Sequence, residues 1–205
     1  MTEMIATRQA YGDALVELGE KNKDIVVLDA DLSKSTTTAK FGKKYPDRFF
    51  NMGVAEANMM NTAAGLATCG KIPFVSSFSI FATGRAWEQI RNTICYSGLN
   101  VKIVATHSGV SVGPDGASHQ CIEDLSLMRT IPTMTVIEPC DAVETRKAIL
   151  AAVDYKGPVY IRLGRAAVPV ITKKEDPYTI GKANILRMGD DVAIVACGAL
   201  VVNSL

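Results

Sequence analysis

The sequence predicts an α/β protein whose parallel sheet is flanked by helices on both faces. Short runs rich in β-branched residues alternate with longer segments in which apolar residues recur every three to four positions. The short runs, such as residues 25–28 (IVVL), are apolar at consecutive positions, which is typical of strands buried on both faces. Their alternation with helical segments favours parallel strands joined by crossover helices.

Each element follows from the local pattern of apolar and turn-forming residues. Residues 10–18 carry apolar side chains on one face of a helix, and Gly53 marks a turn before a helix rich in small residues. In chain order, helices are predicted at 10–18, 37–44, 54–68, 85–96, 121–129 and 141–153. Strands are predicted at 25–28, 49–52, 73–78, 101–106, 134–137, 159–161 and 192–197.

Composition and charge exclude several classes of protein. The chain has 205 residues, of which 48% are hydrophobic and 21% are charged, as expected for a globular rather than a disordered protein. A net charge of +1 offers no basic surface for nucleic acid or for a membrane. The sequence shows neither a membrane-spanning run nor a secretory signal pattern, so a cytoplasmic protein is expected. Five scattered cysteines indicate reduced thiols rather than a zinc site or a disulfide framework.

Two segments interrupt the alternation of strands and helices. Residues 107–120 (HSGVSVGPDGASHQ) form a loop of glycines and small polar residues at the carboxyl end of a strand, where open α/β sheets bind ligands. A polar stretch with lysines and prolines follows the last strand of the sheet. We therefore expect a domain over residues 1–170, a linker over 171–187 and the start of a truncated second domain over 188–205, as in a fragment of a longer polypeptide.

The two histidines are the clearest candidates for chemistry. His107 and His119 both belong to the loop 107–120, where either could titrate near neutrality or donate to a substrate. A structural, hydrogen-bonded histidine is an equal alternative for each. The loop fits neither Gly-x-Gly-x-x-Gly nor a Walker motif, so dinucleotide or nucleoside triphosphate binding is not favoured.

Five further side chains have both a functional and a structural interpretation. Glu56 lies in the first turn of a helix, where a carboxylate also complements the helix dipole. Phe78 and Phe81 could bind a ring-shaped ligand or belong to the core. Arg8 and Arg162 could bind phosphate or form surface ion pairs.

Four short motifs occur in an order and spacing that resemble a known family. They are NMGVAEANM at 51–59, FSIF at 78–81, THS at 106–108 and DGASHQ at 115–120. Together they resemble the pyrimidine-binding domain of transketolases, and the match runs from about Arg8 to Arg162. The form that the chain resembles most is the C-terminal subunit of a split transketolase.

The resemblance implies roles in binding thiamine diphosphate and a sugar phosphate. Glu56 would hydrogen-bond the aminopyrimidine ring and promote deprotonation of the cofactor, in apolar surroundings. Phe78 and Phe81 would form the wall against which the pyrimidine stacks, and His119 would be a catalytic residue that contacts the donor ketose. The implied substrate-binding residues are Arg8, Asp31, Ser35, His107, Asp115 and Arg162.

The resemblance also implies a second subunit. The sequence has no Gly-Asp-Gly motif with a following Asn, so no metal ligand is assigned in this chain. Mg²⁺ and the diphosphate of the cofactor would be held by a diphosphate-binding transketolase subunit. A homodimer of this chain within a heterotetramer is expected.

The implied activity is the transfer of a two-carbon ketol unit between sugar phosphates, as in pentose phosphate metabolism. Two related thiamine enzymes are alternatives, namely 1-deoxyxylulose-5-phosphate synthase and the β subunit of a 2-oxoacid dehydrogenase. A non-catalytic assembly module of the same fold is a further alternative, because fold alone does not fix function.

Overall fold

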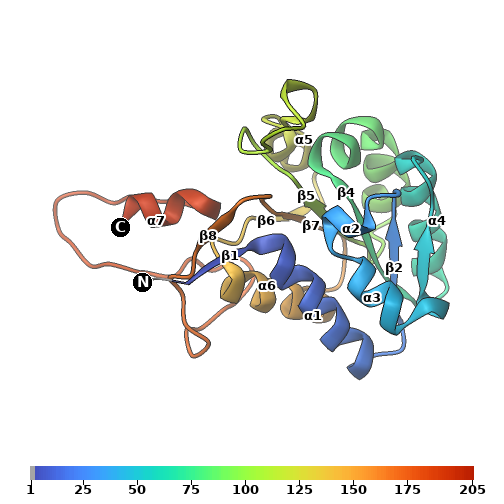
Figure 1. Cartoon of the computed structure of the whole chain (residues 1–205), viewed down its shortest axis with the longest axis horizontal. Coiled ribbons are helices and arrows are strands. Elements are labelled where there is room, and N and C mark those ends of the chain that lie inside the picture. Colours follow the sequence, from blue (N-terminus) through green and yellow to red (C-terminus); the bar gives the residue numbers. More distant parts are fainter. Residues whose placement is uncertain (1–2) are drawn as a thin grey trace.

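A six-stranded parallel sheet lies between two layers of helices in the computed structural model, which describes residues 3–205 (Figure 1). The strand order is β3-β2-β4-β5-β7-β6, and every neighbouring pair is parallel. The strands are β2 (Ile25–Asp29), β3 (Phe49–Asn51), β4 (Ile72–Phe78), β5 (Lys102–Thr106), β6 (Thr135–Ile137) and β7 (Val159–Arg162). The predicted α/β class with helices on both faces is confirmed.

Successive side chains of each strand point to opposite faces of the sheet, and each face has its own helical layer. Ile25 and Val27 belong to one core cluster, whereas Val26 and Leu28 belong to the other. The first layer contains α1 (Thr7–Lys21), α3 (Ala39–Lys44) and α6 (Ala142–Asp154). The second contains α4 (Glu56–Thr68), α5 (Asp124–Arg129) and two π-helical segments, η2 (Ile80–Arg85) and η3 (Gln89–Tyr96).

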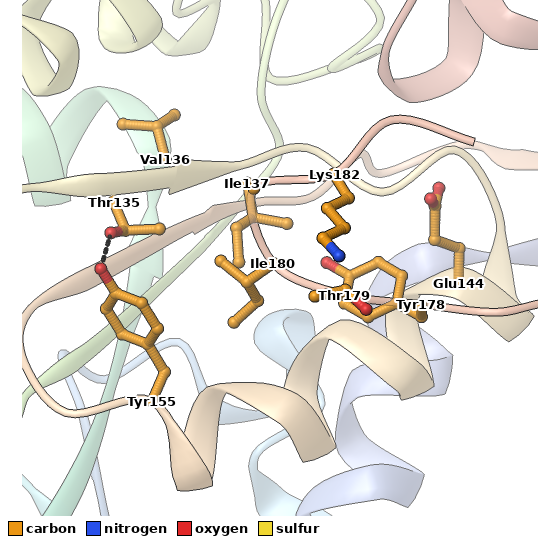
Figure 2. Close-up of a pocket in the computed structure, with 10 residues that line it drawn as sticks. Thr135, Val136, Ile137, Glu144, Tyr155, Tyr178, Thr179, Ile180 and Lys182 are labelled. Carbon is orange, nitrogen blue, oxygen red and sulfur yellow. Dashed lines mark hydrogen bonds between the residues drawn. The ribbon is translucent and has the colours of Figure 1, made fainter. Parts of the chain in front are cut away.

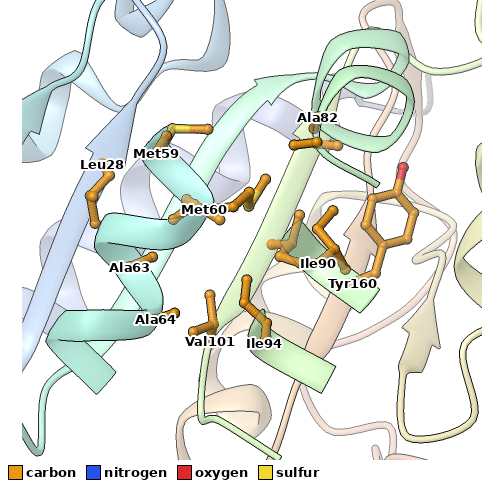
Figure 3. Close-up of a cluster of buried hydrophobic side chains, with 14 of the residues drawn as sticks. Leu28, Met59, Met60, Ala63, Ala64, Ala82, Ile90, Ile94, Val101 and Tyr160 are labelled. Carbon is orange, nitrogen blue, oxygen red and sulfur yellow. The ribbon is translucent and has the colours of Figure 1, made fainter. Parts of the chain in front are cut away.

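The core beneath α4 holds the start of that helix in place. Figure 3 shows Met59 and Met60 of α4 beside Leu28 of β2, with Ile90 and Ile94 of η3 in the same cluster. All five side chains are fully buried. Because burying a large apolar side chain stabilises the fold by about 1.5–3 kcal/mol, this cluster fixes the position of the first turn of α4.

Two predicted elements differ from the structure. The helix predicted at 37–44 begins only at Ala39, as α3, because Thr37 takes a left-handed conformation with φ 70° and ends a preceding short helix, α2 (Ser33–Thr36). The strand predicted at 192–197 is wrong, since the segment is irregular and Val192, Ile194 and Val195 are exposed. A strand requires a neighbour that pairs its backbone groups, and no residue in the described part of the chain pairs with this segment.

Several short elements were not predicted. β1 (Met4–Ala6) pairs in antiparallel fashion with β8 (Ala167–Pro169), beside the main sheet. The last segment extends away from the sheet (Figure 1). Its amide at Gly198 donates to the carbonyl of Glu138 at 3.1 Å. The remaining short helices are η1 (Pro46–Arg48), η4 (Ala117–His119), η5 (Gly198–Leu200) and α7 (Val201–Ser204). Across residues 3–205, no helix combines the length and the apolar character needed to cross a membrane.

Candidate active site

The predicted site residues come from different strands and meet at one edge of the sheet. Phe78 ends β4, His107 follows β5, and Arg162 ends β7. Because the six strands are parallel, their carboxyl ends lie at the same edge, where open α/β sheets bind ligands. Glu56 begins α4, and Asp31 follows β2.

Glu56 is a buried carboxylate with a polar partner at each oxygen. Its side chain is 3% exposed. The hydroxyl of Ser77 donates to Oε1 at 3.3 Å, and Nη1 of Arg85 lies 3.4 Å from Oε2. The expected apolar surroundings are therefore only partly present, because Met59 and Met60 fill the core below while the carboxylate itself meets polar groups. A buried carboxylate requires such partners to offset its loss of hydration.

Four rings form an aromatic cluster at the same edge of the sheet. The rings of Phe78 and His107 stack at a centroid distance of 3.8 Å, and Phe81 lies 6.2 Å from Phe78 in a nearly parallel orientation. His119 meets the ring of Phe81 edge-on at 5.1 Å. Phe78 is only 5% exposed, whereas Phe81 is half-buried. Phe81 is therefore the more accessible of the two predicted stacking rings.

His107 is held in an unusual conformation inside the site. Its φ of 58° is left-handed, a region that non-glycine residues seldom occupy and that is frequent at functional sites. Its Nδ1 lies 2.9 Å from Oγ1 of Thr106. Burial lowers the pKa of His107 to about 4, and the nearby charge of Arg8 acts in the same direction. The ring is therefore neutral at pH 7 and acts as a hydrogen-bonding group rather than as a cation.

This buried histidine should make the fold sensitive to acid. The unfolded chain protonates His107 near pH 6.5, whereas the folded chain resists protonation until about pH 4, so acid favours unfolding within this window. Between pH 6.5 and 4.5, the wild type should lose about 2 kcal/mol more unfolding free energy than His107→Asn. Asn tolerates the left-handed backbone. Urea denaturation at several pH values measures the difference, and parallel pH curves for the two proteins would contradict it.

Two arginines lie together beside His107. Nη1 of Arg8 donates to the carbonyl of Ser35 at 2.7 Å, and its Nε donates to the carbonyl of Arg165 at 3.3 Å. Burial lowers the pKa of Arg8, and the charge of Arg165 adds to that effect. Within residues 3–205, neither guanidinium lies within ion-pair distance of a carboxylate. Two cations without an anionic partner are suited to binding an anion such as phosphate.

Arg165 is a site residue that the sequence analysis missed. It belongs to the loop after β7, and the available signal was this position at the carboxyl end of a strand. The glycine-rich loop packs against it, since a Cβ on Gly113 would lie 2.7 Å from its Nη1. Gly109 similarly faces Nη2 of Arg162, at 3.3 Å from the position of a Cβ. Both glycines have positive φ, so a side chain at either position would be strained and would also require the facing arginine to shift.

Arg162 is engaged by carboxylates rather than open to a phosphate. Its Nε donates to Oδ2 of Asp124 at 2.8 Å, and its Nη1 donates to Glu138. The hydroxyl of Tyr160 donates to the same oxygen of Asp124 at 2.7 Å. The side chain of Arg162 is only 17% exposed. Its location therefore supports a structural role beneath the site, and its contact with phosphate stays a prediction.

Removing Arg162 should consequently reduce stability. Arg162→Ala leaves the buried carboxylate of Asp124 and the partly buried carboxylate of Glu138 without their cation, which should cost about 3 kcal/mol of unfolding free energy. The control is Arg146→Ala, which breaks an exposed ion pair with Glu17 and should cost less than about 1 kcal/mol. Guanidinium denaturation measures both values. Equal losses from the two substitutions would contradict the structural role of Arg162.

The loop after β2 places two further predicted residues. Buried Asp29 accepts hydrogen bonds from the amide of Leu32 at 2.6 Å and from the hydroxyls of Thr36 and Thr38. These bonds shape the segment that carries Asp31, in the loop, and Ser35, in the following helix α2.

The two acidic residues predicted to bind substrate, Asp31 and Asp115, are exposed to solvent. Asp31 has a left-handed φ of 64° and accepts a hydrogen bond from Nδ2 of Asn51 at 2.9 Å. Asp115 lies in the glycine-rich loop, close enough for its charge to favour protonation of His107. Within residues 3–205, no three His, Cys, Asp or Glu side chains are grouped as a metal site.

A separate hollow lies away from this edge of the sheet. It is enclosed by β6, α6 and the segment 178–182, and has a volume of about 370 Å³ (Figure 2). Thr135 and Tyr155 form a hydrogen bond at one end, and Tyr178 and Lys182 lie at the other. The hollow shares no residue with the predicted site.

Comparison with known proteins assigns a family to this arrangement. The family described as "Transketolase, pyrimidine binding domain" matches residues 3–170. The chain belongs to this transketolase family. The glycine-rich loop and the residues at the sheet edge therefore lie within a transketolase pyrimidine-binding domain.

Three relatives and one solved structure illustrate the similarity. A transketolase C-terminal section from Methanocaldococcus jannaschii is 56% identical over 97% of this chain and 63% of its own length. A 6-deoxy-6-sulfo-D-fructose transketolase subunit from Clostridium sp. is 44% identical over 97% of this chain and 62% of its own length. One of the subunits of an apulose-4-phosphate transketolase from Phocaeicola vulgatus is 42% identical over 97% of this chain and 64% of its own length. A solved split-gene transketolase, described as an inactive beta4 tetramer, has a TM-score of 0.90 and 56% identity over 98% of this chain and 65% of that chain. The chain thus spans less than two thirds of these relatives.

Proposed function

We propose that this chain is the C-terminal subunit of a split, thiamine diphosphate-dependent transketolase, which transfers a two-carbon ketol unit between sugar phosphates. The observation that carries the proposal is the convergence of two unlike clusters at one sheet edge. One cluster is the buried carboxylate of Glu56 near the half-buried ring of Phe81. The other is the pair of cations Arg8 and Arg165. The first supports binding of an aminopyrimidine, and the second supports binding of a sugar phosphate.

The residues fit the pyrimidine half of the cofactor. Glu56 would hydrogen-bond a ring nitrogen and hold a proton there, while Phe81 would stack on the ring and Phe78 would support it. When bound, thiamine diphosphate supplies the carbon atom that carries the two-carbon unit. His119, which is edge-on to Phe81, would contact the donor ketose as a catalytic residue.

Substrate contacts are proposed along the same edge of the sheet. Arg8 and Arg165 would bind the phosphate, and neutral His107 would add a hydrogen bond. Asp31 and Asp115 would bind sugar hydroxyls, since both carboxylates are exposed to solvent. Ser35 would complete the phosphate site, because Arg8 already bonds its carbonyl.

The relatives favour ketol transfer over the alternative activities. Two of them are named as subunits of transketolases that act on a sulfo-sugar and on a sugar phosphate. Both names describe a sugar with an anionic group, and the pair Arg8 and Arg165 would bind such a group. This supports a transketolase rather than a 2-oxoacid dehydrogenase subunit, a deoxyxylulose-phosphate synthase or an inactive module.

A second subunit is part of the proposal. Mg²⁺ and the diphosphate would be held by that subunit, and two copies of this chain would pair within a heterotetramer. The solved relative described as an inactive tetramer of one subunit supports this requirement. Exposed apolar side chains at Val192, Ile194 and Val195 support a division into a domain at 1–170, a linker at 171–187 and part of another domain at 188–205. The cytoplasmic location remains a prediction from the sequence.

Titration calorimetry with thiamine diphosphate tests the proposal. The chain alone should show weak or undetectable binding, because stacking and a few hydrogen bonds must offset the ordering of the ligand without ionic anchoring. Addition of a diphosphate-binding transketolase subunit and Mg²⁺ should restore micromolar or tighter binding together with ketol transfer. Submicromolar, Mg²⁺-dependent binding by the chain alone would contradict the division of the site between two subunits.

A further inference from the structure

Arg85 contacts two residues of the proposed cofactor site, although neither the sequence motifs nor the proposed function assigns it a role. Its Cζ lies 4.2 Å from the centre of the Phe81 ring. Its Nη1 lies 3.4 Å from Oε2 of Glu56. A single side chain therefore covers the accessible stacking ring and the buried carboxylate at the same time.

These two contacts are also the ones that an aminopyrimidine requires. A guanidinium is planar and carries N–H donors, so it can lie over an aromatic ring while it donates to a carboxylate. An aminopyrimidine bound at Glu56 and Phe81 would likewise combine stacking with a hydrogen bond to the carboxylate. The guanidinium and the pyrimidine would thus compete for the same partners.

The local backbone explains how Arg85 reaches this position. Phe81 and Arg85 lie in the π-helical segment η2, which ends at Arg85. A π-helical turn is wider than an α-helical turn and is frequent at functional sites. The turn directs both side chains toward the start of α4, where Glu56 lies.

The contacts of Arg85 are weak enough to be replaced. Its side chain is 53% exposed, and its distance to Glu56 is long for an ion pair. Because the guanidinium is mostly in contact with water, its cation–π contact contributes little, and its ion pair with Glu56 is weaker than a pair buried on both sides. Among residues 3–205, Glu56 is the one carboxylate within ion-pair distance of Arg85, so no second anion holds the guanidinium in place.

We propose that Arg85 is a displaceable stand-in for the aminopyrimidine ring. In the free chain, the guanidinium of Arg85 pairs with Glu56 and covers Phe81, and it leaves both residues when the cofactor binds. The inference rests on the proposed function. The guanidinium is then the cationic partner of the buried carboxylate of Glu56, whose charge would otherwise be unpaired. Arg85 is thus a positioning residue that competes with the cofactor.

The binding test compares Arg85→Ala with a matched control in the complex of this chain with its diphosphate-binding subunit. Arg91→Ala removes the same charge from the neighbouring segment η3, where Arg91 lies 5.9 Å from the Trp87 ring and contacts neither Glu56 nor Phe81. Calorimetry with thiamine diphosphate and Mg²⁺ should give a Kd about three- to tenfold lower for Arg85→Ala and within about twofold of the wild type for Arg91→Ala. Unchanged or weaker binding by Arg85→Ala would overturn the inference, and weaker binding would make Arg85 a cofactor ligand.

A second measurement needs no cofactor. In the free chain, the Nε–Hε proton signal of Arg85 should be shifted upfield by the Phe81 ring, and Phe81→Leu should remove the shift. Absence of the shift would overturn the stacked position of Arg85. If the shift is present but neither wild-type nor variant complex binds thiamine diphosphate, the proposed function fails and the stand-in role fails with it. If both complexes bind with the same Kd, the stand-in role alone fails.

Discussion

Glu56→Gln is expected to reduce turnover of the reconstituted enzyme by at least about 100-fold while the chain stays folded. The substitution keeps the size of the side chain and its hydrogen bond with Ser77, but removes the group that holds a proton at the pyrimidine. Positioned proton transfer contributes about 10²–10⁴-fold in enzymes. No other carboxylate in the described part of the chain shares this buried position at the start of α4. Steady-state kcat with the partner subunit, together with circular dichroism, measures the effect.

The control for this substitution is Glu88→Gln. Glu88 is exposed and bonds its own neighbours Gln89 and Asn92, so its loss should leave kcat within about twofold of the wild type. Near-normal turnover by Glu56→Gln would remove Glu56 from the mechanism. A loss of activity in both variants would point to damage unrelated to the carboxylate at the site.

The combined substitution Arg8→Ala and Arg165→Ala should raise KM for phosphorylated sugars by about 100-fold or more and lower kcat by less than about threefold. Each guanidinium would make charge-assisted hydrogen bonds to phosphate, worth about 1.5–3 kcal/mol apiece. Interactions made equally in the ground state and the transition state affect KM rather than kcat. Steady-state kinetics with a phosphorylated donor and with an unphosphorylated ketose measures the difference.

The unphosphorylated ketose is the decisive comparison for this pair. Its KM should change by less than about threefold, because it offers no phosphate to the two arginines. Arg129→Ala, which removes an exposed charge from the end of α5, is the matched control and should change neither substrate's kinetics. Equal effects on both sugars would show that Arg8 and Arg165 do not bind the phosphate.

The sheet could be predicted because its strands are apolar at consecutive positions. The run at Ile25–Asp29, for example, is buried at every residue. Residues 192–197 have a similar composition but no neighbouring strand among residues 3–205, and composition alone does not reveal whether a partner exists. β1 and β8 are too short to be recognised locally, since their pairing joins segments far apart in the chain. The helix predicted at 85–96 is π-helical over Gln89–Tyr96, because the apolar patterns of π- and α-helices differ little, and the π-helical turn at Ile80–Arg85 was not predicted.

The motifs located the groups of the candidate site, but not their partners. Glu56, Phe81 and His119 were identified from short motifs and lie at one edge of the sheet. Arg165 was missed because its neighbour, Arg8, is 157 residues away in sequence. Arg162 was identified without its ion pairs, because no local pattern reveals that Asp124 and Glu138 lie beside it in the fold. Pairwise contacts of this kind are set by the tertiary fold rather than by local sequence.

The pairing of β1 with β8 has a consequence for engineering. Met4 and Pro169 are register partners, so the first and last strands of the sheet-bearing unit lie side by side, at the usual spacing of about 5 Å between neighbouring strands. Closely spaced ends are the geometry that circular permutation requires. A short glycine-rich linker could therefore join these two strands. The new chain termini could be opened in an exposed loop such as that around Gly70, at the edge of the sheet opposite the candidate site.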